Sequence, residues 1–210
     1  VYSQQTTTWY GGPQARQSVE DHSLGMYQAL IEARMPFEML HDRTLDRAGR
    51  YKLLLLPNIA ALSTEQCDQI RAFVENGGSV LATYQTSLYD ENGAQRPDFG
   101  LAGLFGVSWR KTLDGPIPNS YLRVEESGRR HPLMKGLEDA ELLINGTYQL
   151  EVEPIAKFEP PFLTAIPPYP SQPMEKNMWG VKKTDKPGVF LRRAGKGRVV
   201  DRVRGAGARA

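Results

Sequence analysis

The chain has 210 residues, of which 40% are hydrophobic and 24% charged, the balance of an ordinary globular protein with a sizeable core. Lysine and arginine total 26 against 24 for aspartate and glutamate, so the formal net charge is +2, and seven of the basic residues lie from Arg192 onward. The rest of the chain is slightly acidic and has no basic stripe. This composition argues against whole-chain disorder and against a nucleic-acid partner.

Cysteine and histidine are too sparse to suggest a disulfide or a metal site. The single cysteine, Cys67, has no partner, and the three histidines show no ligand spacing, so we expect neither a metal nor a cofactor. No run approaches the roughly 20 apolar residues that span a bilayer, and a membrane partner is not expected. The chain opens at Val1 directly in a strand-like segment, which suggests a piece of a longer protein. A soluble protein is expected, either cytoplasmic or exported.

Strand and helix signals alternate through the first hundred residues. Residues 1–3 favour a strand, a polar run and a loop through 11–13 follow, and helical spacing predicts a helix over 18–34 that Pro36 ends. Residues 37–40 read as a second strand.

A continuous apolar run at 51–56 is typical of a strand buried on both faces. Ser63 and Gln66 form a capping box that starts the next helix, Gly77-Gly78 ends it, and 79–84 is the next strand. Short connections between alternating strands and helices predict an α/β domain: a mostly parallel sheet in three layers, with helices on both faces.

The second half is rich in proline and glycine and has little helical periodicity. Short strands are expected at 120–125, 147–152, 162–166, and at 189–192 paired with 198–200 through an edge hairpin turn at 194–197. We expect these later strands to extend or edge the first sheet, with long Pro-rich loops around them.

No residue pattern supports catalysis. Cys67 falls on the buried stripe of its helix, and no G-x-S-x-G or G-x-C-x-G motif is present. Asp90, Glu91 and Asp98 fit turn chemistry better than the paired acids of a sugar-cleaving enzyme. Ligands of doubly wound sheets bind at the carboxyl ends of the strands. That rule predicts a pocket formed by Ser3, Gln4, Gln5, Asn58, Tyr84, Gln85, Thr86 and Ser87.

Three stretches, residues 51–67, 73–93 and 99–107, resemble the trimerisation domain of β-galactosidase-type glycoside hydrolases. That domain belongs to the class I glutamine-amidotransferase-like superfamily, and the resemblance implies a flavodoxin-like sheet over residues 1–200. It also implies an upstream (β/α)₈ barrel that carries the catalytic glutamates, so no catalytic residue can be carried over to this chain. In amidotransferase relatives the nucleophilic cysteine sits at the turn after the strand equivalent to 79–84. Tyr84 or Gln85 stands near that position here, so the resemblance implies a domain that has kept the fold and lost the active site.

Residues 201–210 lack the apolar strand that such domains place after the Gly-Lys-Gly-Arg-Val-Val hairpin, and we expect a non-native or poorly ordered tail there. The loop 85–99 carries Tyr89 and Phe99 around a turn, and we expect these rings to contact a neighbouring subunit or the barrel.

The sequence thus favours a non-catalytic accessory domain that self-associates as a trimer or dimer and shapes the mouth of a neighbouring sugar site. Two alternatives stay open. One is a stand-alone amidotransferase-like hydrolase or transferase. The other is a carbohydrate-binding module using Trp9, Tyr10 and Tyr89, with carbohydrate as its partner.

Overall fold

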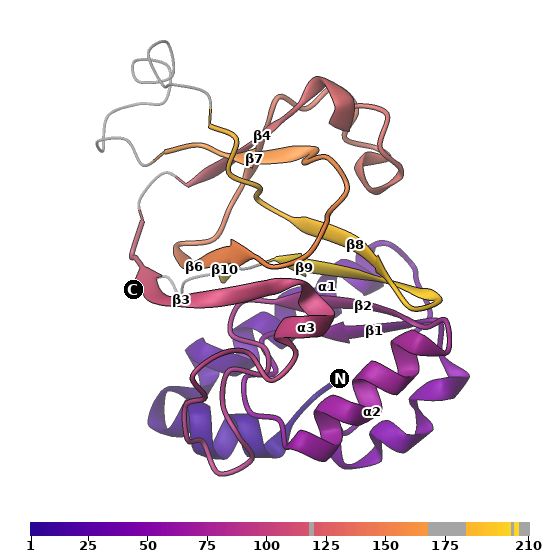
Figure 1. Ribbon diagram of the computed structural model, residues 1–210, viewed down its shortest axis with the longest axis vertical. Coiled ribbons are helices and arrows are strands. Elements are labelled where there is room, and N and C mark those ends of the chain that lie inside the picture. Colours follow the sequence, from indigo (N-terminus) through magenta and orange to yellow (C-terminus); the bar gives the residue numbers. More distant parts are fainter. Residues whose placement is uncertain (118–119, 168–183, 203, 206–210) are drawn as a thin grey trace.

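The computed structural model describes residues 1–117, 120–167, 184–202 and 204–205 (Figure 1). The α-helices are α1 Asp21–Glu32, α2 Thr64–Glu75 and α3 Ala102–Phe105. The strands are β1 Leu53–Leu56, β2 Ser79–Thr83, β3 Val107–Asp114, β4 Tyr121–Val124, β5 Leu142–Ile144, β6 Tyr148–Pro154, β7 Leu163–Ala165, β8 Phe190–Ala194, β9 Gly197–Arg202 and β10 Arg204–Gly205. Shorter 3₁₀ and π-helical turns occupy Thr6–Gly11, Gly12–Gln14, Arg16–Glu20, Asp42–Arg50, Glu126–Gly128 and Pro132–Met134.

The main sheet has the order β1-β2-β9-β8 and is mixed. β1, β2 and β9 are parallel, and β8 runs antiparallel to β9. The last pair of that hairpin, Ala194 and Gly197, encloses a two-residue turn, as the sequence predicted. The predicted strands at 51–56 and 79–84 are also confirmed, each slightly shortened.

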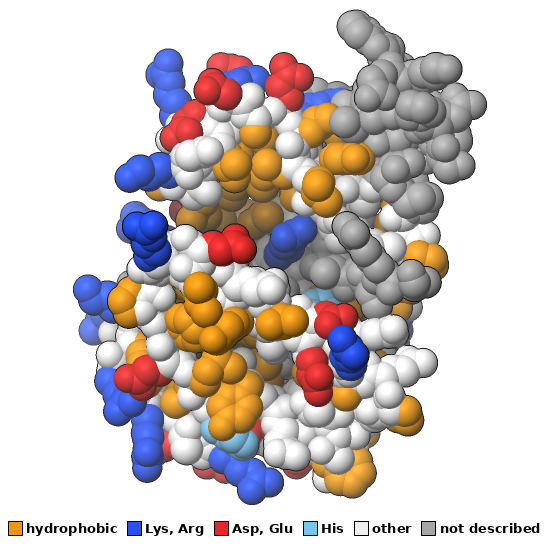
Figure 2. Space-filling view, turned by 180° about the vertical axis from the view of Figure 1, so that it is seen from behind, with side chains coloured by type: hydrophobic (Ala, Val, Ile, Leu, Met, Phe, Trp, Pro, Cys, Tyr) orange, Lys and Arg blue, Asp and Glu red, His pale blue; other side chains and the backbone are white. Residues whose placement is uncertain are grey.

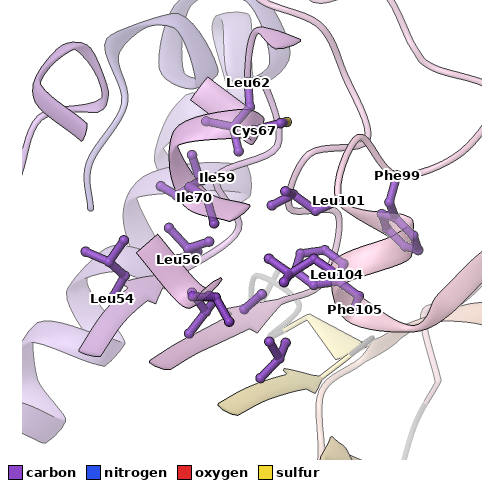
Figure 3. Packing of buried hydrophobic residues seen from close by; sticks show 14 of the residues in the cluster. Leu54, Leu56, Ile59, Leu62, Cys67, Ile70, Phe99, Leu101, Leu104 and Phe105 are labelled. Atoms are coloured by element: carbon purple, nitrogen blue, oxygen red, sulfur yellow. The ribbon is translucent and has the colours of Figure 1, made fainter. Parts of the chain in front are cut away.

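Helix α2 connects β1 and β2 and begins at the predicted capping box. The Ser63 hydroxyl accepts from the Gln66 amide at 3.1 Å, and the Gln66 side chain accepts from the Ser63 amide at 2.8 Å. The buried side of α2 carries Cys67 and Ile70 against Leu54 and Leu56 of β1, with Phe105 of α3 completing the core (Figure 3). These side chains are almost fully buried, so they hold α2 and α3 against the sheet.

The N-terminal segment differs from expectation. In place of a loop at 11–13 and a helix starting at 18, the chain is helical almost throughout from Thr6 to Glu32. Gly11 packs against Ala15 and Val19, and Pro13 is compatible with the first turn of a 3₁₀ segment. The helical conformation of this segment therefore depends on close packing between residues such as Gly11, Ala15 and Val19, whereas the predicted helix was based on a repeat of larger apolar residues.

The predicted strands at 1–3 and 37–40 are reduced to a single parallel bridge between Tyr2 and His41. The Tyr2 amide donates to the Leu40 carbonyl at 3.0 Å, and the Asp42 amide donates to the Tyr2 carbonyl at 3.0 Å. Residues 1–3 and 39–42 thus lie side by side beyond the outer edge of β1. The Val1 amine joins them to β1 by donating to the Leu55 carbonyl at 2.8 Å.

The expectation that the later strands extend or edge the first sheet holds only for the β8–β9 hairpin. Only β8 and β9 join the main sheet, whereas β10-β6-β3 and β5-β4-β7 form two separate antiparallel sheets, the first of which packs Val107 and Leu150 into the core of the main sheet. In Figure 1, the sheet β5-β4-β7 lies above the main sheet and far from α2. A short strand can be recognised from its own sequence, but the sequence does not show which other strand it pairs with. The Pro-rich stretch 168–183 lies outside the described residues.

Strand structure continues past residue 200, where the sequence predicted the domain to end. β9 continues through Asp201 and Arg202, and Arg204–Gly205 pairs with β6. Asp201 is 2% exposed. Residues 206–210 lie outside the described part of the chain, so the non-native origin of the tail stays a prediction.

Candidate functional site

Five of the eight predicted pocket residues come together at the carboxyl edge of β1 and β2. The Asn58 amide donates to the Thr83 hydroxyl at 3.0 Å, and the Asn58 carboxamide oxygen accepts from the Gln85 amide at 3.1 Å. Thr86 donates its hydroxyl to the Leu56 carbonyl at 3.1 Å, while the Ser87 hydroxyl accepts from the Leu101 amide at 3.1 Å. The polar groups of this edge therefore bond to one another and to the backbone.

The N-terminal helical segment lies over this edge. The Asn58 carboxamide donates to the Ser18 carbonyl at 2.7 Å, and the Tyr10 hydroxyl donates to the Gln85 side chain. Asn58, Gln85, Thr86 and Ser87 are all buried. Contacts within the chain thus occupy the edge at which a ligand was predicted, and ligand binding there stays a prediction.

The other three predicted residues lie elsewhere. Ser3 donates its hydroxyl to Asp42, and Gln5 donates to the Ala61 carbonyl at 2.9 Å and to the Gln66 side chain at 2.6 Å. Gln4 is exposed to solvent. Ser3 and Gln5 tie the N-terminal segment to the 3₁₀ turn at Asp42–Arg50 and to the start of α2.

Tyr84 stands at the sharp turn after β2, with a left-handed φ of 55°. The His22 ring stacks on it with centroids 5.9 Å apart. Burial raises the pKa of Tyr84, raises the pKa of Tyr10 to about 12 and lowers the pKa of His22, so each of these groups is neutral at pH 7. A strained turn is present, but the side chain on it is a neutral phenol in place of a nucleophile.

Neither of the other candidate nucleophiles is activated. Cys67 is 1% exposed, and burial raises the pKa of its thiol to about 11. Among the described residues, Ser87 and Cys67 have no histidine as hydrogen-bond partner. In the same part of the chain, no group of three or more His, Cys, Asp or Glu side chains could hold a metal ion.

Asn58 should act as a structural residue. Its φ of 51° suits asparagine, and replacing it with alanine removes hydrogen bonds to Ser18 and Gln85 while keeping the strained backbone. We expect Asn58→Ala to lower the free energy of unfolding by about 2–4 kcal/mol, because the buried Gln85 amide and the partly buried Ser18 carbonyl lose their partners. Urea unfolding measures this loss. Gln4→Ala, at an exposed site, should change stability by less than about 0.5 kcal/mol; equal losses in both variants would contradict the assignment.

Tyr89 and Phe99 of the loop 85–99 were expected to contact a neighbouring subunit or the barrel, and Phe99 instead packs inside its own chain. Phe99 is 4% exposed and packs edge-on against Phe105, with ring centroids 5.9 Å apart. Tyr89 is half-buried against Tyr10, at 5.0 Å. The loop folds back on its own core because its backbone bonds to the chain after β1, where the Leu62 amide donates to the Tyr89 carbonyl at 3.1 Å.

The acidic residues of this loop serve the backbone, as their turn-like pattern suggested. Asp90 accepts from the amides of Asn92 and Ala94, and Asp98 accepts from the amide of Trp109 at 2.8 Å. Trp9 is 60% exposed and lies against Gly93, whereas Tyr10 and Tyr89 are half-buried and their rings are tilted by 56° to each other. These aromatic residues therefore do not present a shared flat surface for a sugar ring.

A surface that sequence reasoning missed lies on α1. No residue of this twelve-residue helix is buried, although it contains Leu24, Met26, Tyr27, Leu30 and Ile31. Leu24 and Ile31 are each 51% exposed, and Met35 just beyond the helix is 58% exposed. Figure 2 shows hydrophobic side chains gathered on the lower half of the face that contains α1. The signal in the sequence was apolar residues on more than one side of a helix.

None of the helices among the described residues combines the length and apolar character needed to cross a bilayer.

A comparison with protein-family models identifies the family of this chain. The family model of the β-galactosidase trimerisation domain matches residues 2–130. The β-galactosidase BglY of Alicyclobacillus acidocaldarius is 25% identical over 155 residues, covering 70% of this chain and 22% of that protein.

Solved structures share the fold. A β-galactosidase from Bacillus circulans sp. alkalophilus superimposes with a TM-score of 0.68 at 14% identity, covering 92% of this chain and 26% of that one. A Salmonella typhimurium cytoplasmic protein, STM3548, superimposes with a TM-score of 0.58 at 11% identity, covering 88% of this chain and 76% of that one. The chain thus spans about a quarter or less of the β-galactosidases it matches. With the family model covering more than half of its length, the chain belongs to the β-galactosidase trimerisation domain family.

Proposed function

We propose that this chain is the non-catalytic association domain of a β-galactosidase-type glycoside hydrolase, and that it brings copies of that protein together through α1. The observation that carries the proposal is a helix with an apolar surface and no buried residue, in a domain whose family is described by trimerisation. The described residues supply no activated nucleophile, which supports an accessory role. The active site of the assembled protein then belongs to a (β/α)₈ barrel outside this chain.

The outer side of α1 is suited to protein contact. Leu24 and Ile31, seven residues apart, lie two helical turns from each other on one side of the helix, and each is half exposed. Exposed apolar groups of this size gain free energy when a partner covers them. The proposal includes the flavodoxin-like, three-layer arrangement. It is supported by the parallel strands β1, β2 and β9 and by residues 1–3 and 39–42, which lie side by side along the outer edge of β1.

Sedimentation equilibrium of the purified chain tests this role. We expect reversible self-association, and the double variant Leu24→Glu/Ile31→Glu should weaken it roughly a hundredfold or more, because two carboxylates would have to be desolvated in the contact. The matched control is Leu133→Glu/Ile144→Glu, two residues that are 54% and 82% exposed and lie away from α1. Association that survives the α1 substitutions, or that the control abolishes, would contradict the proposal.

A further inference from the structure

Arg202, the last residue of β9, lies at the carboxyl edge of the main sheet beside the turn that follows β2. Its carbonyl accepts from the Tyr84 amide at 2.7 Å, and the His22 ring of α1 stacks on Tyr84. The charge of Arg202 contributes to the lowered pKa of His22, so these two groups lie close together. From the other side, the Asn145 carboxamide oxygen, just after β5, accepts from Arg202 Nη2 at 3.2 Å. Three parts of the chain therefore meet at Arg202: α1, the edge of the main sheet and the sheet β5-β4-β7.

The Arg202 guanidinium has no counter-ion within the described part of the chain. Asn145 is its one hydrogen-bond partner there, and its Nε is buried without a partner. The neighbouring Asp201 cannot neutralise it, because successive strand residues point to opposite faces and burial raises the pKa of that carboxyl to about 8. Burial lowers the pKa of Arg202, yet an arginine stays charged at pH 7. The result is a partly buried positive charge that no described side chain balances.

The cluster also contains more hydrogen-bond donors than acceptors. An arginine side chain carries several N–H groups, and the Asn145 oxygen accepts from one of its nitrogens. The Asn145 amide nitrogen is itself buried without a partner. Burial raises the pKa of Tyr84, so its hydroxyl keeps a proton that it can donate. The component that this cluster lacks is an acceptor with negative charge.

Arg192 is a structural arginine of the same fold and serves as a comparison. It is also partly buried and has an unpartnered Nε, but its Nη1 donates to the Gly103 and Leu104 carbonyls at 2.8 and 3.3 Å. Two peptide carbonyls therefore share its charge. Arg202 has a single carboxamide in their place, so more of its charge stays unmatched.

We propose that Arg202, Asn145 and Tyr84 form a binding site for a small oxyanion, the carboxylate or phosphate group of a small molecule. The planar guanidinium matches the paired oxygens of either group. The Arg202 side chain is partly exposed, so an ion can reach it from solvent. The site lies at the edge where α/β sheets bind ligands, and of the predicted pocket residues it uses only Tyr84. It goes beyond the association role of α1 and does not depend on it.

An NMR titration with inorganic phosphate tests the site. Phosphate is added at pH 7, sodium chloride keeps the ionic strength constant, and the Tyr84 amide and the His22 ring report binding. We expect saturable shifts of both signals, with a dissociation constant of the order of a millimolar. Arg202→Gln should weaken binding about tenfold or more. The matched control is Arg198→Gln, at an exposed position of the same strand, which should leave binding unchanged.

Asn145→Asp is the second variant, and it decides the matter if Arg202→Gln does not fold. Aspartate has nearly the shape of asparagine, so the contact with Arg202 is kept. Its carboxylate supplies the missing negative charge from within the chain. We therefore expect a folded protein that binds phosphate about tenfold or more less tightly. Acetate, titrated in the same way, distinguishes the two ligand groups: comparable affinity assigns a carboxylate, and much weaker affinity assigns a phosphate.

Three results would overturn the proposal. The first is a shift that grows linearly with phosphate and is matched by chloride. The second is phosphate binding that Arg202→Gln leaves intact, or that Arg198→Gln weakens equally. The third is unchanged binding in Asn145→Asp. Self-association through α1 is measured separately by sedimentation, so a failure of either proposal leaves the other standing.

Discussion

Asp201→Asn is expected to stabilise the protein strongly at pH 8 and scarcely at pH 4. Asp201 lies in β9 between Ala82 of β2 and Phe190 of β8, is 2% exposed, and has one carboxylate oxygen without a hydrogen-bond partner. Desolvation raises the pKa of this carboxyl from 3.8 to about 8. The folded protein therefore holds a proton that the unfolded chain has released.

The sign of the pH dependence follows from that proton. A carboxyl whose pKa is higher in the folded state contributes fully to stability below pH 3.8 and loses that contribution as pH rises to about 8. Asparagine has a similar shape and does not titrate. The difference in unfolding free energy between variant and native chain should grow across this window to several kcal/mol, as an order of magnitude.

Urea unfolding at pH 4, 6 and 8 measures that difference. The comparison with the variant is needed because the Val1 amine, whose pKa is lowered to about 6, changes the stability of both proteins in the opposite direction between pH 6 and 8. A difference that stays constant with pH would show that Asp201 is solvated.

Gly197→Ala is expected to be among the most destabilising single substitutions in the chain. A Cβ atom at this position would lie 1.9 Å from the Gly78 carbonyl oxygen and 2.8 Å from that of Val74. Both are backbone atoms at the end of α2, so neither can move as a flexible side chain can. Either the β8–β9 hairpin or the end of α2 must shift, at a cost of about 3 kcal/mol or more.

Gly25→Ala is the matched control. Gly25 lies inside α1, and an added Cβ would meet nothing within 4 Å. Alanine is the better helix former, so this variant should gain about 0.5–1 kcal/mol. Urea unfolding of both variants gives the comparison. A Gly197→Ala protein as stable as the native chain would contradict the close packing of α2 on β9.

The parallel core was predictable because its signals are local. The apolar run of β1, the capping box at Ser63 and the glycines after α2 each specify one element, and short connections then order the strands. The β8–β9 hairpin was predictable for the same reason. The N-terminal helical segment was not, because its polar residues make contacts distant in sequence, such as the Asn58 bond to Ser18, that no periodicity encodes.

The candidate site was predicted in part. The rule that strand ends meet at one edge brought Asn58 together with the turn 84–87. It could not show that the chain from Tyr10 to Ser18 covers that edge. Phe99 was misplaced because an aromatic residue beside a turn is equally compatible with the chain's own core. The exposed apolar residues of α1 appeared in sequence as an ordinary core helix, and only the structure shows that none is buried.

The central claim, association through α1, is tested most directly by the reactivity of a cysteine placed on that helix. In Ile31→Cys the new thiol is half exposed on one chain, whereas Cys67 is buried with a raised pKa and stays unreactive. Alkylation by N-ethylmaleimide is followed over a range of protein concentrations, with Ile144→Cys on β5 as control. Alkylation at residue 31 should slow as concentration rises while that at residue 144 stays constant. A rate at residue 31 that is independent of concentration, in a chain that nevertheless self-associates, would contradict the account.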